Sequence, residues 1–189
     1  MENNHEGRKI YIETERLILR DWMESDYKPF IALNADAEVM EFFPSVQTAD
    51  TTLAQIKRLA GHIATNGFGF FAVERKDNNE FIGFTGLAYP RFEAHFTPCI
   101  EIGWRLSKAD WNQGFATEAA KACLQFGFDS LRTDTIYSFA SVHNQRSENV
   151  MKKIGMVHDG FFEHPSVEEG NWLRKHVLYK ITKQDEHYS

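Results

Sequence analysis

Apolar residues repeat along this chain with two different periods, and the changes of period divide it into elements. A period of two indicates a β-strand with one buried face, whereas a return every three or four residues indicates an amphipathic helix. Apolar residues alternate across residues 10–20, with a polar break at 13–15, which predicts a first strand centred on 16–20. The most regular alternation covers residues 100–106, so this strand has one apolar face and one polar face.

The remaining elements follow from the same two periods. Helices are predicted from Ser25 to about Leu33, over 48–64, from Gly114 to about Leu131 and from Ser147 to Ile154. Further strands are predicted over 68–74, 80–87, 135–142, 156–162 and 173–181, with the first two joined as a hairpin. The order predicts an α/β (α+β) fold, a single domain with a central twisted mixed β-sheet of about seven strands flanked by about four helices. We place the domain at residues 10–183, between a flexible N-terminus at 1–9 and a flexible tail at 184–189.

Composition narrows the range of partners. With 21 Lys+Arg against 27 Asp+Glu the net charge is −6, which argues against nucleic acid and favours cationic ligands such as amines. Cys99 and Cys123 cannot form a disulfide framework, and neither they nor the histidines of the second half show metal-ligand spacing. No stretch approaches the roughly 18 apolar residues of a membrane span, and the first residues do not resemble a signal peptide. We therefore expect a cytoplasmic protein with no membrane partner and no metal.

The turn between the strand at 100–106 and the helix that begins at Gly114 suits a phosphate group. Its core reads Trp-Asn-Gln-Gly-Phe-Ala-Thr over residues 111–117. Small residues at 114 and 116 allow close backbone approach, and a helix N-terminus presents unpaired N–H groups. An ordinary strand-to-helix turn, in which glycine eases the packing, accounts for the same residues. The turn is neither a Walker A loop nor a dinucleotide fingerprint, because both lack their glycine spacing here.

Three motifs in the right order resemble those of the GNAT N-acetyltransferases. Residues 101–106 followed by 111–119 look like their acetyl-CoA motif. Residues 144–156 match the Asn-x-x-Ser-x-x-Val-x-x-Lys-x-Gly pattern of the branch containing the ribosomal-protein N-terminal acetyltransferases, and residues 14–20 look like its first strand. The resemblance covers about residues 10–182. It implies an acetyltransferase that passes an acetyl group from acetyl-CoA directly to a primary amine in a ternary complex.

The resemblance also implies how acetyl-CoA, the co-substrate, is held. The strand at 100–106 would contact the pantetheine arm through the backbone, and the loop after it would hold the phosphates mainly through N–H groups. The family usually has Gln or Arg where this chain has Trp111, a departure that backbone contacts tolerate. The predicted cofactor-binding residues are Trp104, Leu106, Trp111, Asn112, Gln113, Gly114, Phe115, Ala116, Thr117, Asn144 and Ser147. Further phosphate contacts are expected from Arg105, Lys108 or the Gln113 side chain.

Two side chains are the predicted catalytic residues, each with a structural alternative. Glu101 lies on the polar face of its strand and matches a glutamate base in part of the family; alternatively, it pairs with Arg105 or another cation as part of the structure. Ser147 matches a serine given the role of general acid in the similar branch; alternatively, it only satisfies the first turn of its helix. Met151 stands where many family members have a tyrosine acid, and it cannot donate a proton. Asn144 binds the amide arm of the cofactor or merely caps the same helix.

The acceptor is expected to enter across the sheet from the cofactor. Candidate wall residues are Phe42, Phe43, Pro44, His164, Pro165 and Arg174. The similar branch uses a glutamate that aligns near Ser166, with other glutamates close by, so a ribosomal-protein substrate is in doubt. A small-molecule amine and a peptide N-terminus both stay open as acceptors, and a homodimer is one assembly considered. The alternative functions are a non-catalytic acyl-CoA-binding module and a nucleotide-binding protein.

Overall fold

The computed structural model describes residues 8–184, so most of the predicted flexible N-terminus at 1–9 and tail at 184–189 lies outside the described residues. Eight strands form one sheet in the order β1-β2-β3-β4-β5-β6-β8-β7. The strands are β1 (Ile10–Glu13), β2 (Leu17–Arg20), β3 (Phe70–Arg75), β4 (Phe81–Ala88), β5 (Ile100–Leu106), β6 (Thr135–Ser141), β7 (Val157–Glu163) and β8 (Lys175–Thr182). The helices are α1 (Tyr27–Ala35), α2 (Ala49–Asn66), α3 (Phe115–Ser130) and α4 (Gln145–Lys153), with short 3-10 turns η1 (Glu24–Asp26) and η2 (Lys108–Asp110).

This architecture confirms the predicted mixed sheet with four helices, and it adds one strand. The segment 10–20 is an antiparallel hairpin of β1 and β2 rather than one strand. The polar break at 13–15 is its turn, which the Thr14 side chain holds by accepting a hydrogen bond from the Leu17 N–H at 2.9 Å.

Two predicted boundaries also move because polar side chains bind backbone or one another. The helix expected from Ser25 begins at Tyr27, since Asp26 turns inward to accept hydrogen bonds from Arg20 at 2.7 and 2.8 Å. The last strand begins at Lys175 rather than Leu173, because the Asn171 side chain accepts from the Leu173 N–H and holds a turn there.

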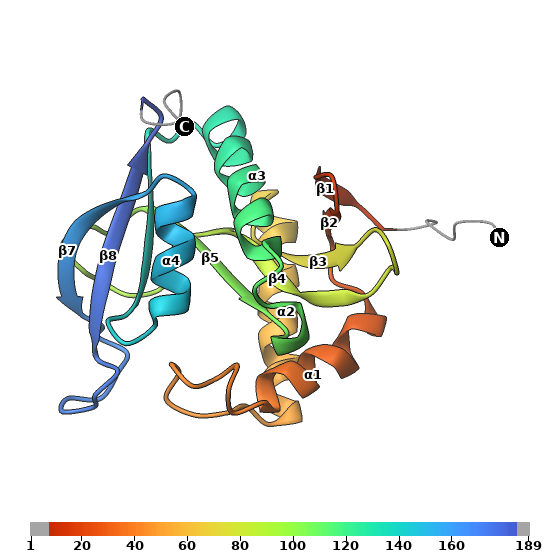
Figure 1. The fold of residues 1–189 in the computed structure, drawn as a ribbon, viewed down its shortest axis with the longest axis horizontal. Helices are drawn as coiled ribbons and strands as arrows, with labels where there is room; N and C mark the ends of the chain where they lie inside the picture. Colours follow the sequence, from red (N-terminus) through yellow and green to blue (C-terminus); the bar gives the residue numbers. More distant parts are fainter. Residues whose placement is uncertain (1–7, 185–189) are drawn as a thin grey trace.

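The helices cover opposite faces of the sheet (Figure 1). The α3 helix lies across β4 and β5 on one face, and its apolar side packs into the main core with Cys123 and Leu124. The α1 and α2 helices cover the other face, where Phe30 and Ile56 form a second cluster with Phe84 of β4. Cys123 is fully buried and Cys99 only partly so.

The sheet opens between its two central strands. The β5 and β6 strands are its only parallel neighbours within residues 8–184, and they pair only at Ile100 and Glu101 on β5. Beyond Glu101 the two strands diverge, as Figure 1 shows for β5 against the strands around β8. Residues 103–106 of β5 therefore have a neighbouring strand on the β4 side alone. This opening positions the site described next.

Candidate active site

The free edge of β5 presents backbone groups of alternate residues. The Ser107 N–H donates to the Ile82 carbonyl of β4 at 2.8 Å. Because successive residues of a strand point to opposite sides, the N–H and C=O groups of Trp104 and Leu106 point away from β4. The Ile102 carbonyl, which faces the same way, accepts a hydrogen bond from the Ser138 hydroxyl of β6 at 3.0 Å. The backbone N–H groups of Trp104 and Leu106 thus face the opening and have no partner among residues 8–184.

The loop after β5 is built to point backbone amides at one spot. Asn112 and Gly114 both have positive φ, +60° and +84°, and Gly114 is the N-cap of α3. The N–H groups of residues 115–117 are the first of the helix, and such groups have no carbonyl partner within it. The positive end of the helix dipole adds to their attraction for an anion.

The carboxylate of Glu118, in the first turn of α3, does not cancel that attraction, because side chains of the β1–β2 turn bind it. Glu118 accepts hydrogen bonds from Thr14 Oγ1 at 2.6 Å and from the Arg16 side chain at 2.6 Å. Burial opposes ionisation, but these bonds keep the pKa of Glu118 below its usual value. The hairpin turn at 14–16 therefore neutralises Glu118 and fixes the start of α3 against β2.

Trp111 has two contacts at this loop. Its indole N–H donates to the Leu106 carbonyl at 2.9 Å, so it closes the end of the free β5 edge. Its ring lies under the Arg146 guanidinium of α4, 4.5 Å from the ring centroid, and Arg146 also pairs with Glu41 at 2.6 Å. Arg146 was not predicted from the sequence, and its position depends on partners about 35 and 105 residues away that no local pattern connects.

The free edge, the loop and α4 surround a cavity of about 310 Å³, here called the Gly114 cavity. All the predicted cofactor-binding residues line it except Gln113, whose side chain donates to the Ala109 carbonyl at 2.8 Å instead. Lys108 does not line it either and pairs with Glu38. The cations that do line it are Arg105, Arg146 and Lys153.

A second cavity of about 890 Å³, the Glu101 cavity, lies on the other side of β5. The two cavities share lining residues, Asn144 and Ser147 among them, so they meet at the N-terminus of α4. Of the predicted wall residues, Phe42, Phe43, Pro44 and His164 line the Glu101 cavity, whereas Pro165 and Arg174 do not. Ser166 lines it, but Glu163, Glu168 and Glu169 do not.

Glu101 is a carboxylate without a partner. It makes no hydrogen bond or ion pair with any residue in the range 8–184, so the alternative of a pair with Arg105 or another cation there is wrong. Arg105 instead donates to Asn34 Oδ1 of α1 at 2.7 Å. Burial raises the pKa of Glu101 to about 7, which makes it a group that can take up and release a proton near neutral pH.

The start of α4 combines an observed cap with a free hydroxyl. Asn144 Oδ1 accepts a hydrogen bond from the Ser147 N–H at 3.1 Å. Asn144 therefore caps the helix, which is one of its two predicted roles. The Ser147 hydroxyl has no protein partner within the described part of the chain. Met151 is buried below it and lines the Glu101 cavity. The cofactor contacts of Asn144 and Ser147 stay predictions.

Two histidines of the Glu101 cavity carry no charge at neutral pH. The rings of His164 and His176 lie 4.9 Å apart. Burial, together with the charge of His176, lowers the pKa of His164 to about 4, and burial lowers the pKa of His176. No group of three or more His, Cys, Asp or Glu side chains in residues 8–184 is arranged to hold a metal ion. None of the described helices is long and apolar enough to cross a membrane.

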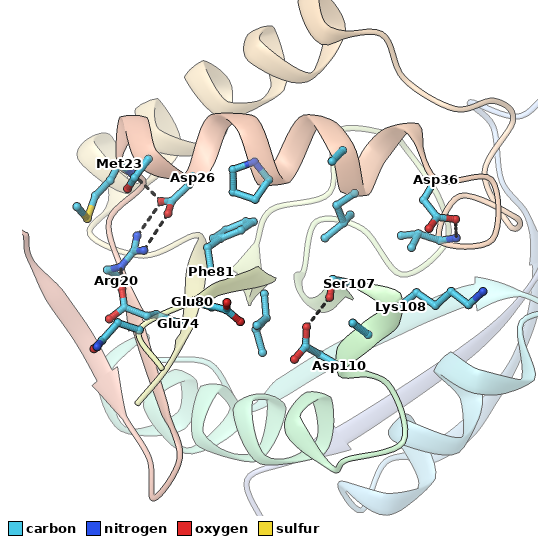
Figure 2. A pocket seen from close by; sticks show the side chains of 18 of the residues that line it. Arg20, Met23, Asp26, Asp36, Glu74, Glu80, Phe81, Ser107, Lys108 and Asp110 are labelled. Carbon is cyan, nitrogen blue, oxygen red and sulfur yellow. Dashed lines mark hydrogen bonds and ion pairs between the residues drawn. The ribbon is translucent and has the colours of Figure 1, made fainter. Parts of the chain in front are cut away.

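A third cavity, the Arg20 cavity of about 1150 Å³, lies between α1, β4 and η2 (Figure 2). It is larger than the Glu101 cavity, and most of its charged side chains are in ion pairs. Arg20 contacts Asp26 and Glu74 at 2.7 Å, and all three are almost fully buried. Asp110 accepts from the Ser107 hydroxyl and pairs with Arg75 at 3.1 Å.

Comparison with known proteins identifies the family. The sequence model described as "Acetyltransferase (GNAT) domain" matches residues 16–157. The chain is 30% identical over 177 residues to the uncharacterized N-acetyltransferase YnaD of Bacillus subtilis, covering 93% of this chain and 99% of that protein. The chain therefore belongs to the GNAT acetyltransferase family, and the prediction of an acetyl-CoA-dependent N-acetyltransferase is confirmed at that level.

Solved structures agree in fold. A GNAT-family acetyltransferase from Bacillus anthracis superposes with a TM-score of 0.78 at 28% identity, covering 93% of this chain and 99% of that one. The ribosomal-protein-S5-alanine acetyltransferase of Vibrio fischeri gives a TM-score of 0.70 at 17% identity, covering 94% and 98%. The second likeness shows the shared fold of the branch that the sequence motifs resemble, and it carries no substrate to this chain.

Proposed function

We propose that this protein transfers the acetyl group of acetyl-CoA directly to a primary amine, with both substrates bound at once. The observation that supports this most is the meeting of the two cavities at Asn144 and Ser147, beside the free edge of β5. A donor held in the Gly114 cavity and an acceptor held in the Glu101 cavity would bring their reacting ends together there. Direct transfer needs no covalent enzyme intermediate, and proximity alone then contributes much of the acceleration.

The residues around the Gly114 cavity fit an acyl-CoA. Its orphan amides at 115–117 suit the pyrophosphate, and the free N–H groups of Trp104 and Leu106 suit an amide-containing arm laid along β5 as an added strand. The acidic net charge does not oppose this, because Arg146 and Lys153 supply local positive charge. When bound, acetyl-CoA supplies the reactive thioester, and the protein supplies position and protons.

Glu101 is the proposed general base. Most of an amine with a pKa of about 8 to 10 is protonated at pH 7, so it must lose a proton before it can attack. A carboxylate with a pKa of about 7 accepts that proton far better than one with an ordinary value. Its lack of any partner within residues 8–184 leaves its oxygens free to do so, directly or through one water.

Two other groups at the junction complete the proposed chemistry. The Trp104 N–H points into the opening, where it can donate to an oxygen that gains negative charge during transfer. The Ser147 hydroxyl lines both cavities and can give a proton to the departing thiolate. Met151, buried nearby, has no proton to offer, so Ser147 is the proposed acid.

The test separates binding from chemistry with three variants. Glu101→Gln and Ser147→Ala should keep acetyl-CoA binding in calorimetry and lower kcat on an amine panel by about 100-fold and about 10-fold, respectively. Gly114→Glu should abolish acetyl-CoA binding, since it places a charged side chain at a residue with φ +84°.

Two outcomes would support the alternative functions. Binding of acetyl-CoA without turnover on any amine, peptide N-termini included, would indicate a non-catalytic acyl-CoA-binding module. Stabilisation by ATP and not by acetyl-CoA in a thermal-shift assay would indicate a nucleotide-binding protein. Unchanged acetyl-CoA affinity of Gly114→Glu would overturn the placement of the cofactor.

A further inference from the structure

The charged side chains that line the Glu101 cavity are mostly cationic. They are Arg58, Arg91 and Arg105 against the single carboxylate Glu101, with no Asp and no Lys. The histidines of the cavity do not oppose this balance, because burial keeps the two nearest to β8 neutral. The local charge is therefore positive although the whole chain has a net charge of −6.

Arg105 is a buried cation that has no counter-ion within residues 8–184. Only 9% of the residue is exposed, and its guanidinium donates to the neutral side chain of Asn34. Its Nε is buried and has no acceptor among the described residues. The ring of Phe43 covers the guanidinium at 4.1 Å from the centroid. Burial lowers the pKa of Arg105 to about 10, so it stays charged at neutral pH.

Arg58 of α2 and Arg91 of the connection between β4 and β5 lie at the rim of the same cavity. Both side chains are exposed, and neither makes an ion pair with a carboxylate of residues 8–184. Partial desolvation of the guanidinium and the nearby charge of Arg91 lower the pKa of Arg58, and the same two causes lower the pKa of His62. Two unpaired guanidinium groups thus share one side of the cavity mouth.

The floor between the charged groups is apolar. Glu101 and Arg105 lie on the same face of β5, four residues and about 13 Å apart along the strand. Gly103 lies between them, and the Phe70 ring occupies the space above it, 3.1 Å from where a side chain would begin. Further aromatic side chains complete the walls, among them Phe42, Tyr89 and Phe139. The cavity therefore has one carboxylate and three arginines around an aromatic floor.

We infer that the acceptor is a primary amine that also carries an anionic group, a carboxylate, a phosphonate or a phosphate ester, which Arg58 and Arg91 bind while the amine lies at Glu101. This inference rests on the proposed function and names its substrate class. Guanidinium groups bind such oxyanions through paired, charge-assisted hydrogen bonds, and an unpaired arginine has these donors available. A polyamine would bring further positive charge to a wall that is already positive. The net charge predicts a cationic ligand such as an amine; the inference keeps the amine and adds an anionic group to it.

A matched set of amines tests the inference. The set is 4-(aminomethyl)benzoate, 4-(aminomethyl)phenylphosphonate, the neutral 4-methylbenzylamine and the diamine p-xylylenediamine, which share one aminomethyl-phenyl group. We expect kcat/KM at saturating acetyl-CoA to be about tenfold or more higher for the anionic amines than for the neutral one, and lowest for the diamine. The carboxylate and phosphonate members distinguish the two kinds of anion.

Variants of Arg58 and Arg91 test whether these two residues cause the preference for anionic amines. Arg58→Ala and Arg91→Ala should each raise KM for the anionic amines about tenfold and leave KM for 4-methylbenzylamine unchanged. The double variant Arg58→Glu/Arg91→Glu should reverse the order and favour the diamine. Lys57→Ala is the matched control, because Lys57 precedes Arg58 on α2, is exposed and does not line the cavity.

Calorimetry with the N-acetylated products separates this inference from the proposed function. Equal or better use of the neutral amine or the diamine by the wild-type protein would overturn the inference and leave acetyl transfer intact. Turnover of none of the amines, with acetyl-CoA bound, would count against the proposed function; the order of product affinities would then still decide the inference. Tighter binding of the anionic products would support it, and equal binding would overturn it.

Discussion

The Arg20 cavity and the Glu101 cavity are of similar size and both contain buried charge, but they differ in how that charge is paired. In the Arg20 cavity six of the eight charged side chains that line it are in ion pairs, as Figure 2 shows for Arg20 with Asp26. In the Glu101 cavity none of the four charged side chains is in an ion pair within residues 8–184. Volume alone would have selected the Arg20 cavity, at about 1150 Å³ against about 890 Å³.

The difference in pairing separates a cavity whose charges stabilise the fold from a cavity that we propose binds a substrate. Burying an unpaired charge is costly, so a protein keeps one where something other than its own fold uses it. In the Arg20 cavity the charges compensate one another and connect β2, β3 and η1. In the Glu101 cavity Glu101, Arg58, Arg91 and Arg105 are in no ion pair within residues 8–184, and we propose that such groups serve a substrate beside the free edge of β5.

The largest expected effect breaks the paired cavity. Arg20→Met leaves Asp26 buried without a cation, while Glu74 keeps Arg8 at 2.6 Å, and removing one partner of a buried ion pair costs about 3–5 kcal/mol. Arg105→Met is the matched variant, since it removes a buried arginine that has no carboxylate partner. Its loss of stacking and of one hydrogen bond is offset by relief of burial, so we expect a change below about 1 kcal/mol. Urea unfolding of both variants measures the difference, and equal losses would show that pairing does not distinguish the cavities.

The sequence predicted the fold well because its signals are local. Alternation over 100–106, the glycine at 114 and the pattern over 144–156 placed β5, α3 and α4 and assembled almost the whole lining of the Gly114 cavity. What it could not predict are partners far apart in the chain. Asn34 and Arg105 are 71 residues apart and show no shared pattern, so Glu101 was given a pairing alternative that the structure rules out. The rim of Arg58 and Arg91 was missed for the same reason.

An intermediate effect concerns the unpaired carboxylate and its dependence on pH. The pKa of Glu101 is raised to about 7 in the folded protein, against about 4.3 in an unfolded chain. The folded state therefore binds this proton more tightly than the unfolded state does. The stability that Glu101 contributes is fully present below about pH 4.3 and is lost as the pH rises to about 7. The slope of this loss is no more than about 1.4 kcal/mol per pH unit. Activity should change in the opposite direction, rising through pH 7 as Glu101 ionises.

Glu101→Gln isolates both effects. Urea unfolding between pH 4.5 and 7.5 should show a shallower decline in stability for this variant than for the wild-type protein, and kcat/KM should lose the rise near pH 7. A Glu101→Gln profile with the wild-type slope and the wild-type rise would show that another group titrates there, and the contrast between paired and unpaired carboxylates would fail.

The smallest expected effect concerns two cations near the loop after β5. The sequence suggested Lys108 as a phosphate contact, but Lys108 lines the Arg20 cavity and pairs with Glu38 at an exposed position. Lys108→Ala should therefore leave the Kd for acetyl-CoA within about twofold and the urea midpoint unmoved, as is usual for exposed ion pairs.

Arg146→Ala is the matched change on the other side of Trp111. The Arg146 guanidinium lies 4.5 Å from the indole ring and lines the Gly114 cavity. It should raise that Kd several-fold, because a local cation near the phosphates is lost. A larger effect from Lys108→Ala than from Arg146→Ala in calorimetry would place the phosphates on the η2 side of the loop, in the cavity where most charged side chains are paired.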